Sequence, residues 1–164
     1  MNLTPAIRKR YTTEQKTALE AQRLAQEIAF APVVFQISHL MVKLGVFEAL
    51  CNAPEGLTMQ EVATKTQLSD YAVKILLESS LSIGTVLLKE GDRFAISKAG
   101  WFLLRDKSTR VNMEFIQEVC YEGLFHLEEA LKEGKPAGLK VFGSWPTIYE
   151  GLSQLPKKAQ EKWF

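Results

Sequence analysis

The chain has 164 residues, 46% hydrophobic and 24% charged, which is enough for a domain that buries a core without disulfides or a metal. The formal net charge of +1 gives no basic surplus of the kind that dedicated nucleic-acid binders carry. Cys51 and Cys120 lack partners at metal-ligand spacing, which predicts free thiols in a reducing, cytoplasmic setting. We expect no membrane span, because no apolar run approaches about 20 residues, and no signal peptide at the N-terminus.

The first 30 residues predict a loose basic arm followed by an interface helix. The arm covers residues 1–11 and contains Arg8-Lys9-Arg10. The pattern from Thr12 to Gln15 resembles a capping box, which predicts a helix from there to about Phe30. Small residues on one face of this helix would let a helix of a second subunit approach closely. The predicted dimer-interface residues are Ala18, Ala21, Ala25, Phe30 and Phe35.

Residues 31–110 have the element order of a winged helix-turn-helix domain. Pro32 begins one helix, a capping box from Thr58 to Glu61 begins a second, and Ser69 caps a third over residues 70–82. The last two helices are separated by a short turn. Two β-prone runs at 85–88 and 93–96 flank Glu90-Gly91-Asp92 and predict a hairpin, and Ser97 caps a further short helix. The predicted fold class is therefore mainly α, a winged helix-turn-helix with a small β-hairpin wing and helical extensions at both ends.

Residues 111–164 predict a long helix and a connector. The helix runs from Asn112 to Glu133 and is stopped by Gly134-Lys135-Pro136. A loop, a short helix near residues 147–152 and a helix after Pro156 follow. The predicted divisions are thus 1–30, 31–110 and 111–164, with the last leading toward a cofactor domain outside this chain.

The sequence contains no motif for catalysis or cofactor binding. Its ten glycines form neither GxGxxG nor a phosphate loop, and its only histidines, His39 and His126, lie alone on predicted helices. We therefore predict no catalytic, cofactor-binding or metal site in this chain.

The segment that would read DNA in a winged helix is close to neutral. Residues 70–80 contain one lysine and two acidic residues, and residues 55–110 contain eight basic and seven acidic residues. Phosphate contacts need cations, so this composition disfavours nucleic-acid binding, while exposed apolar residues such as Ile75 favour a protein partner. A DNA-binding transcriptional regulator and a stand-alone dimerisation module stay open as alternatives.

Six short motifs carry a family resemblance. They include HLMVKLGVFEAL at residues 39–50 and GLTMQEVA at 56–63, and the others lie at 68–84, 94–100, 124–136 and 142–150. In this order they resemble the N-terminal winged-helix dimerisation domain of small-molecule S-adenosylmethionine-dependent O-methyltransferases. The chain departs from the family in the third motif, which lacks the arginines usual there.

The resemblance covers about residues 28–155 and implies a function for the chain. In this family the domain forms an intertwined homodimer, and its long helix closes one wall of the pocket for a small-molecule acceptor, expected here to be methylated on a hydroxyl. By position, the wall residues would be Phe115, Val119, Cys120 and His126. The family binds S-adenosylmethionine in a later domain, so the resemblance implies that cofactor for the full-length protein. We expect no membrane partner, because the sequence predicts no membrane-length apolar run.

Overall fold

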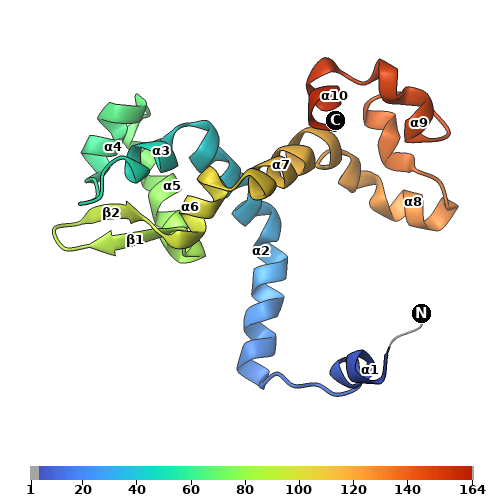
Figure 1. Cartoon of the computed structure of the whole chain (residues 1–164), viewed down its shortest axis with the longest axis horizontal. Coiled ribbons are helices and arrows are strands. Elements are labelled where there is room, and N and C mark those ends of the chain that lie inside the picture. The colour runs from blue at the N-terminus through green and yellow to red at the C-terminus, as the bar shows by residue number, and fades with distance from the viewer. Residues whose placement is uncertain (1–3, 164) are drawn as a thin grey trace.

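The computed structural model describes residues 4–163 and is mainly helical, with one two-stranded sheet (Figure 1). The first three residues of the predicted arm, and Phe164, lie outside the described residues. The first elements are α1 (Pro5–Tyr11), α2 (Ala18–Lys43), α3 (Val46–Cys51), α4 (Met59–Thr66) and α5 (Asp70–Ile83). Next come β1 (Val86–Lys89), β2 (Arg93–Ile96), α6 (Lys98–Arg105), α7 (Lys107–Phe115), the π-helical turn η1 (Ile116–Cys120) and the 3₁₀ turn η2 (Gly123–His126). The last are α8 (Leu127–Glu133), η3 (Ala137–Val141), α9 (Ile148–Gly151), η4 (Leu152–Gln154) and α10 (Lys157–Trp163).

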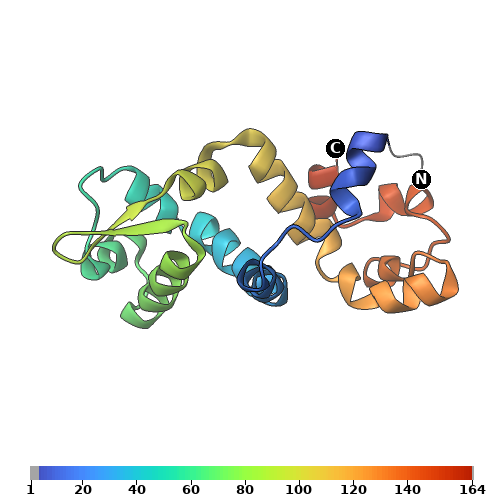
Figure 2. The same cartoon turned by 90° about the horizontal axis from the view of Figure 1, so that it is seen from below.

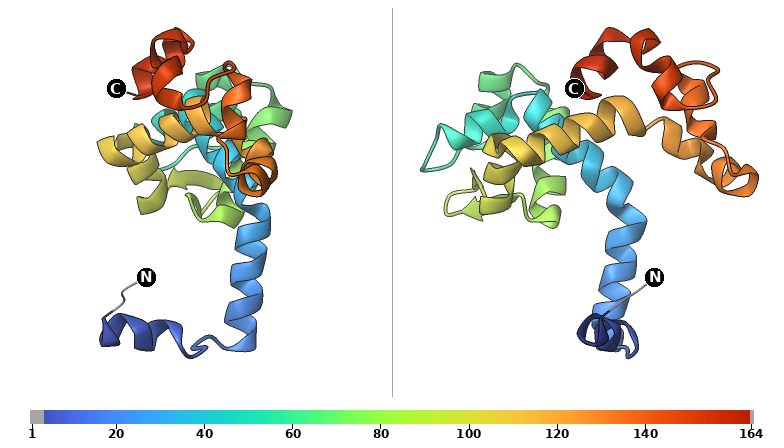
Figure 3. Two further views of the ribbon diagram at one scale, coloured as in Figure 1. Left: turned by 90° about the vertical axis from the view of Figure 1, so that its right-hand side faces the viewer. Right: turned by 45° about the vertical axis from the view of Figure 1, so that its right-hand side comes forward.

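These elements form two groups at opposite ends of the long axis, joined by α7 (Figure 2). Helices α3–α6 and the hairpin make one group, and α8–α10 make the other. The first half of α2 projects away from both, with α1 beyond its tip (Figure 3).

The N-terminal helices differ from the prediction at two points. The loose arm is wrong over α1, where the Thr4 hydroxyl accepts from the Ile7 N–H at 3.5 Å and caps a short helix. The predicted cap at Thr12 is also wrong, because the Glu14 carboxylate instead accepts from the N–H groups of the next two residues and forms a turn. The capping box that begins α2 lies five residues later, between Thr17 and Glu20.

Helix α2 continues through Pro32, where the sequence predicted a new helix. Proline removes one helical donor and usually kinks a helix. The carbonyl that loses its helical donor is that of Ile28, which lies in the exposed half of α2 where water can reach it. The Tyr121 hydroxyl, far along the chain, donates to the Pro32 carbonyl oxygen at 3.2 Å and contacts the helix at this point.

The predicted caps of the first group are confirmed. The Thr58 hydroxyl accepts from the Glu61 N–H at 3.2 Å, and the Glu61 carboxylate accepts from the Thr58 N–H at 2.7 Å. Ser69 begins α5, and Gly84 ends it with a φ of 84° that favours glycine. The predicted hairpin is also present, with Val86 paired to Ile96 and Lys89 to Arg93.

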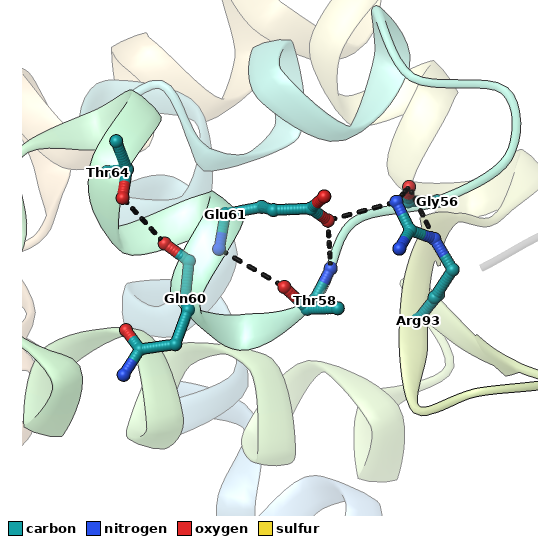
Figure 4. A network of polar contacts seen from close by, with 6 residues as sticks. All are labelled: Gly56, Thr58, Gln60, Glu61, Thr64 and Arg93. Carbon is teal, nitrogen blue, oxygen red and sulfur yellow. Dashed lines mark hydrogen bonds and ion pairs between the residues drawn. The ribbon is translucent and has the colours of Figure 1, made fainter.

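A polar network ties the hairpin to the start of α4 (Figure 4). The Arg93 guanidinium donates to the Gly56 carbonyl at 2.9 Å and to the Glu61 carboxylate at 2.9 Å. Leu57 also forms an isolated bridge with Phe94. These contacts hold the strand against the helical core.

The main core lies within the first group, and Phe47 is its largest fully buried side chain. A Cβ on Gly100 would lie 2.3 Å from the Thr85 carbonyl oxygen and 3.2 Å from Cε1 of Phe47, so only glycine lets α6 pack this closely. The fully buried apolar residues of this core are Met41, Val46, Phe47, Val62, Val73 and Leu77. A second, smaller cluster of buried residues consists of Val119, Leu155 and Ala159.

The long helix predicted over 112–133 is wrong as a single element. It begins earlier, at Lys107, because the Asp106 carboxylate caps it by accepting from the Thr109 N–H at 2.7 Å. It then passes through η1 and η2 before α8. The predicted loop after Gly134 contains η3, whereas short helices near 147–152 and after Pro156 are present as expected.

Candidate functional site

Three of the four predicted wall residues line one pocket. Phe115, Val119 and Cys120 face a cavity of about 440 Å³ at the second group, and His126 does not line it. The Nδ1 atom of His126 instead lies 3.8 Å from a carboxylate oxygen of Glu129. The other lining residues are Gly123, Leu124, Pro136, Gly138, Leu139, Phe142, Thr147 and Ile148.

The π-helical turn η1 brings these side chains together. The Tyr121 N–H donates to the Ile116 carbonyl at 2.8 Å, a five-residue spacing that widens the helix by one residue. This spacing lets Phe115 and Cys120 share one face. Such a turn leaves little trace in the sequence, since the apolar periodicity there fits an ordinary helix.

The opposite side of η1 contacts α2. The side-chain amide of Gln36 donates to that of Gln117 at 2.8 Å, and the Phe35 ring stacks on Tyr121 with centroids 5.4 Å apart. Phe35 also stacks on His39. The same short segment therefore touches the pocket on one side and α2 on the other.

Most of the far wall of the pocket comes from a segment that was predicted to be a loop. Leu139 and Phe142 supply apolar surface there, and Gly138 packs against Gly123, whereas Ile148 comes from the short helix predicted near residues 147–152. The apolar residues in this predicted loop could have indicated that it is partly buried, because loops on the surface are usually polar.

The pocket offers an apolar environment without a charged side chain among its lining residues. Burial raises the pKa of the Cys120 thiol, so this group stays protonated at neutral pH and acts as an apolar contact. Within residues 4–163 there is no group of three histidine, cysteine or acidic residues able to hold a metal ion. The arrangement is an open apolar recess that can contact a small molecule, and its lining residues include no charged acid or base.

A separate polar cluster fastens α10 to α7 and η1. The ammonium of Lys162 lies 2.7 Å from the Glu114 carboxylate, which also pairs with Arg110, and Lys158 lies 2.6 Å from Glu118. His39 lies on a neighbouring cavity, where burial first and Lys43 second lower its pKa. The imidazole is therefore neutral at physiological pH. The ion pairs of this cluster join α10 to α7 and η1.

We predict that α10 loosens in acid. Hydrogen bonding from Lys162, then from Arg110, lowers the pKa of Glu114 below its ordinary value of 4.5. A depressed folded-state pKa gives stabilisation that is complete above the ordinary value and is lost as pH falls through the lowered one. Hydrogen-exchange protection of α10, corrected for intrinsic rates, should fall about two- to fivefold from pH ~7 to pH ~3.

A matched pair of variants checks this assignment. Glu114→Gln should reduce α10 protection at neutral pH and remove most of its dependence on pH. Glu133→Gln, at the exposed end of α8, should behave like the unchanged chain. An unchanged pH profile in Glu114→Gln would assign the effect to another group.

The first half of α2 presents an apolar surface to solvent. Every residue from 18 to 33 except Ala21 is exposed. Of the predicted interface residues, Ala18, Ala25 and Phe30 are exposed, whereas Phe35 is partly buried against Tyr121. Ile28, which lies on the same predicted stripe as the alanines, is also exposed, and the further large exposed apolar side chains of this half are Leu19, Leu24 and Val33.

A groove of about 960 Å³ runs beside this surface, between α2 and α5. Phe30 and Val33 line it from α2, and Ser82 and Ile83 from α5. Its volume and its mostly apolar walls suit a helix or another extended apolar segment.

The prediction of no membrane-length apolar segment is wrong for α2. By length and composition, Ala18–Lys43 is apolar enough to cross a membrane. The prediction missed it because Pro32 was taken as a helix boundary. An exposed helix that packs against another protein meets the same criterion. The length and composition of α2 therefore do not distinguish a membrane from a protein partner.

The surface of α5 and the hairpin is not a cationic ridge. Tyr71 and Ile75 are exposed on α5 beside Lys74 and Glu78. On the hairpin, the Lys89 ammonium donates to the Pro54 carbonyl at 2.7 Å. The Arg93 guanidinium donates to the Gly56 carbonyl and to the Glu61 carboxylate. The cations that could meet phosphates here are few and partly engaged.

Comparison with known proteins identifies the segment. Residues 22–94 match the family model of the Dimerisation2-like domain. Acetylserotonin O-methyltransferase of Macaca mulatta is 28% identical over 130 residues, which cover 76% of this chain and 38% of that enzyme. The chain thus spans well under half the length of the curated relatives it matches.

Solved structures share the fold. The S-adenosylmethionine-dependent methyltransferase SibL aligns with a TM-score of 0.69 at 22% identity, covering 84% of this chain and 42% of SibL. LepI in complex with SAM aligns with a TM-score of 0.73 at 16% identity, covering 96% of this chain and 41% of LepI. Residues 22–94 of the chain therefore match a Dimerisation2-like domain, and the chain shares its fold with part of these methyltransferases.

Proposed function

We propose that this chain is the dimerisation and substrate-lid part of a cytoplasmic S-adenosylmethionine-dependent methyltransferase that acts on a hydroxyl group of a small molecule. The observation that carries the proposal is that the segment matching a Dimerisation2-like domain contains most of the exposed apolar helix α2, and that an apolar pocket lined by residues after this segment is joined to α2 through η1. The relatives of this segment are named as methyltransferases. Helices α3–α6 with the β1–β2 hairpin are proposed to be a winged helix-turn-helix.

The proposed partner at α2 is a second copy of the chain. Leu24, Ile28, Phe30 and Val33 would leave water when two copies pair, and the groove between α2 and α5 offers each copy a complementary surface. Burial of apolar area of this kind is the usual driving force of homodimer formation.

The proposed role of the pocket is to enclose the methyl acceptor. Methyl transfer needs the acceptor oxygen in line with the methyl group and shielded from water. Phe115, Val119 and Cys120 would provide a dry wall. S-adenosylmethionine would supply the methyl group, and this sequence has no GxGxxG loop of the kind that binds nucleotide cofactors.

The proposal is tested with the full-length gene product. Calorimetry should detect S-adenosylmethionine binding to the full-length protein and none to the 164-residue chain, and transfer of labelled methyl groups to hydroxylated aromatic compounds should follow. A natural gene that ends at the codon for Phe164, or a full-length protein that does not bind the cofactor, would contradict the proposal.

A further inference from the structure

We propose that the cavity between the end of α2, α7, η1 and α10 binds a small divalent oxyanion, either a free ion or a phosphate group carried by a small molecule. This cavity shares no lining residue with the apolar pocket beside η1. The proposal goes beyond methyl transfer and does not depend on it, so the two can succeed or fail separately.

The lining of the cavity has more cations than its carboxylates can neutralise. Among the described residues, its charged side chains are the cations Lys43, Arg110, Lys158 and Lys162 and the carboxylates Glu114 and Glu118. With the imidazole of His39 neutral, the lining has a surplus of two positive charges. The pKa of Lys162 is raised by Glu114 first and by Glu161 more weakly, and Glu161 does not line the cavity. This surplus favours an anion with two negative charges.

The surplus lies at two places in the cavity. One carboxylate serves two cations, because Glu114 lies 3.0 Å from Arg110 and 2.7 Å from Lys162. The exposed Lys43, at the end of α2, has no ion pair within residues 4–163. Lysine has three N–H donors and arginine has five, so an ion pair leaves further donors for a second acceptor. Lys43 on one side and the cations of α7 and α10 on the other can therefore donate to one oxyanion.

The size of the cavity suits a small ion. Its volume of about 240 Å³ lies below the range of about 300–1,000 Å³ that holds drug-sized ligands. Val42 and the buried Met113 complete the lining and restrict access of water on that side. Charge-assisted hydrogen bonds to an oxyanion gain strength where water is restricted.

His39 reports the charge of this cavity from its own lining position. Burial first and Lys43 second lower the pKa of its imidazole, while Glu118 and Lys158 act more weakly and in opposite directions. An anion next to Lys43 would oppose the effect of that lysine, so the pKa of His39 should rise when the anion binds. By linkage, the protonated imidazole then favours the anion, and anion affinity should increase as pH falls through the pKa of His39.

An NMR titration with sulfate tests the site, because sulfate stays a dianion over the range in which histidine titrates. The signals of His39 should shift saturably and its pKa should rise, whereas His126, which lies outside the cavity beside Glu129, should not respond. Sodium chloride at the same ionic strength should have neither effect. Thermal stability is a poor readout here, since sulfate stabilises most folded proteins through its exclusion from their surface. An unshifted His39, or an equal response to chloride, would overturn the proposal.

Glycerol 3-phosphate distinguishes the two sources of the anion. Affinity equal to or lower than that of sulfate assigns the site to a free ion. Higher affinity assigns it to a small molecule that carries a phosphate group. Failure of both probes to bind contradicts the proposal.

Lys43→Gln tests the cation that has no ion pair to break. It should lower the affinity for sulfate about fivefold or more, because one charge-assisted donor is lost. Lys65→Gln, exposed on α4, makes the same change in net charge and should leave the affinity unchanged. Equal weakening in both variants would show that only the overall charge matters and that the cavity is not the site.

Glu118→Gln provides a test that structural damage cannot imitate. It removes a carboxylate from the lining and releases Lys158, which lies 2.6 Å from Glu118, so sulfate affinity should rise about threefold or more. A damaged cavity would lose affinity rather than gain it. Glu133→Gln, which changes the net charge equally at an exposed position, should show no gain. A folded Glu118→Gln chain without a gain would refute the assignment, and if this variant does not fold, Lys43→Gln decides.

Discussion

Replacing Phe30 with aspartate should convert a dimer of this chain into a monomer. Light scattering of the unchanged chain should give twice its mass of 18.5 kDa. Phe30 is 59% exposed in the single chain, so Phe30→Asp costs the isolated fold little. In the proposed dimer the same position becomes buried and the carboxylate loses its hydration, while Arg23, the cation that lines the same groove, already pairs with Glu27. We expect dimer dissociation to increase about 100-fold or more, equivalent to about 2.7 kcal/mol.

The control for this experiment is Leu131→Asp. Leu131 is 76% exposed on α8, far along the chain from α2, and the same change there should leave the dimer intact. Equal dissociation of the two variants would point to a general charge effect. A dimeric Phe30→Asp variant would show that α2 is not the interface. Binding of the unchanged chain to lipid vesicles, lost in Phe30→Asp, would instead assign the apolar face of α2 to a membrane.

Local rules account for the parts of the fold that could be predicted. The capping box at Thr58, the cap at Ser69 and the end of α5 at Gly84 each depend on a few neighbouring residues. The hairpin depends on a change in apolar period and on a short turn. Because these signals are carried by adjacent residues, they can be recognised in a single sequence.

Contacts between distant residues account for the parts that could not. Pro32 lies inside α2, and the segment that contacts the helix there includes Tyr121, 89 residues later, whose hydroxyl donates to the Pro32 carbonyl. The face shared by Phe115 and Cys120 depends on a π-helical turn whose sequence also fits an ordinary helix. The family resemblance indicated the wall residues, yet the opposite wall at Phe142 and Ile148 became visible only when the chain was folded.

The stability of the first group should depend on Phe47 more than on any exposed aromatic residue. Phe47 is 0% exposed, and its ring lies where α6 makes its closest approach at Gly100. Phe47→Ala removes a large buried ring that the close packing of Gly100 against Thr85 cannot easily collapse to fill. The free energy of unfolding should therefore fall by about 3–5 kcal/mol, measured by urea denaturation.

Phe102→Ala makes the comparison specific to burial. Phe102 is 53% exposed and makes an edge contact with Trp101, with ring centroids 5.3 Å apart. The same truncation there should cost about 1 kcal/mol or less, since little apolar surface returns to water and no cavity forms. If the two variants lose similar stability, the ring of Phe47 does not hold α3, α6 and the hairpin together. Since α2 is anchored to this group through Met41, a large loss at Phe47 should also weaken the dimer, whereas Phe102→Ala should leave it unchanged.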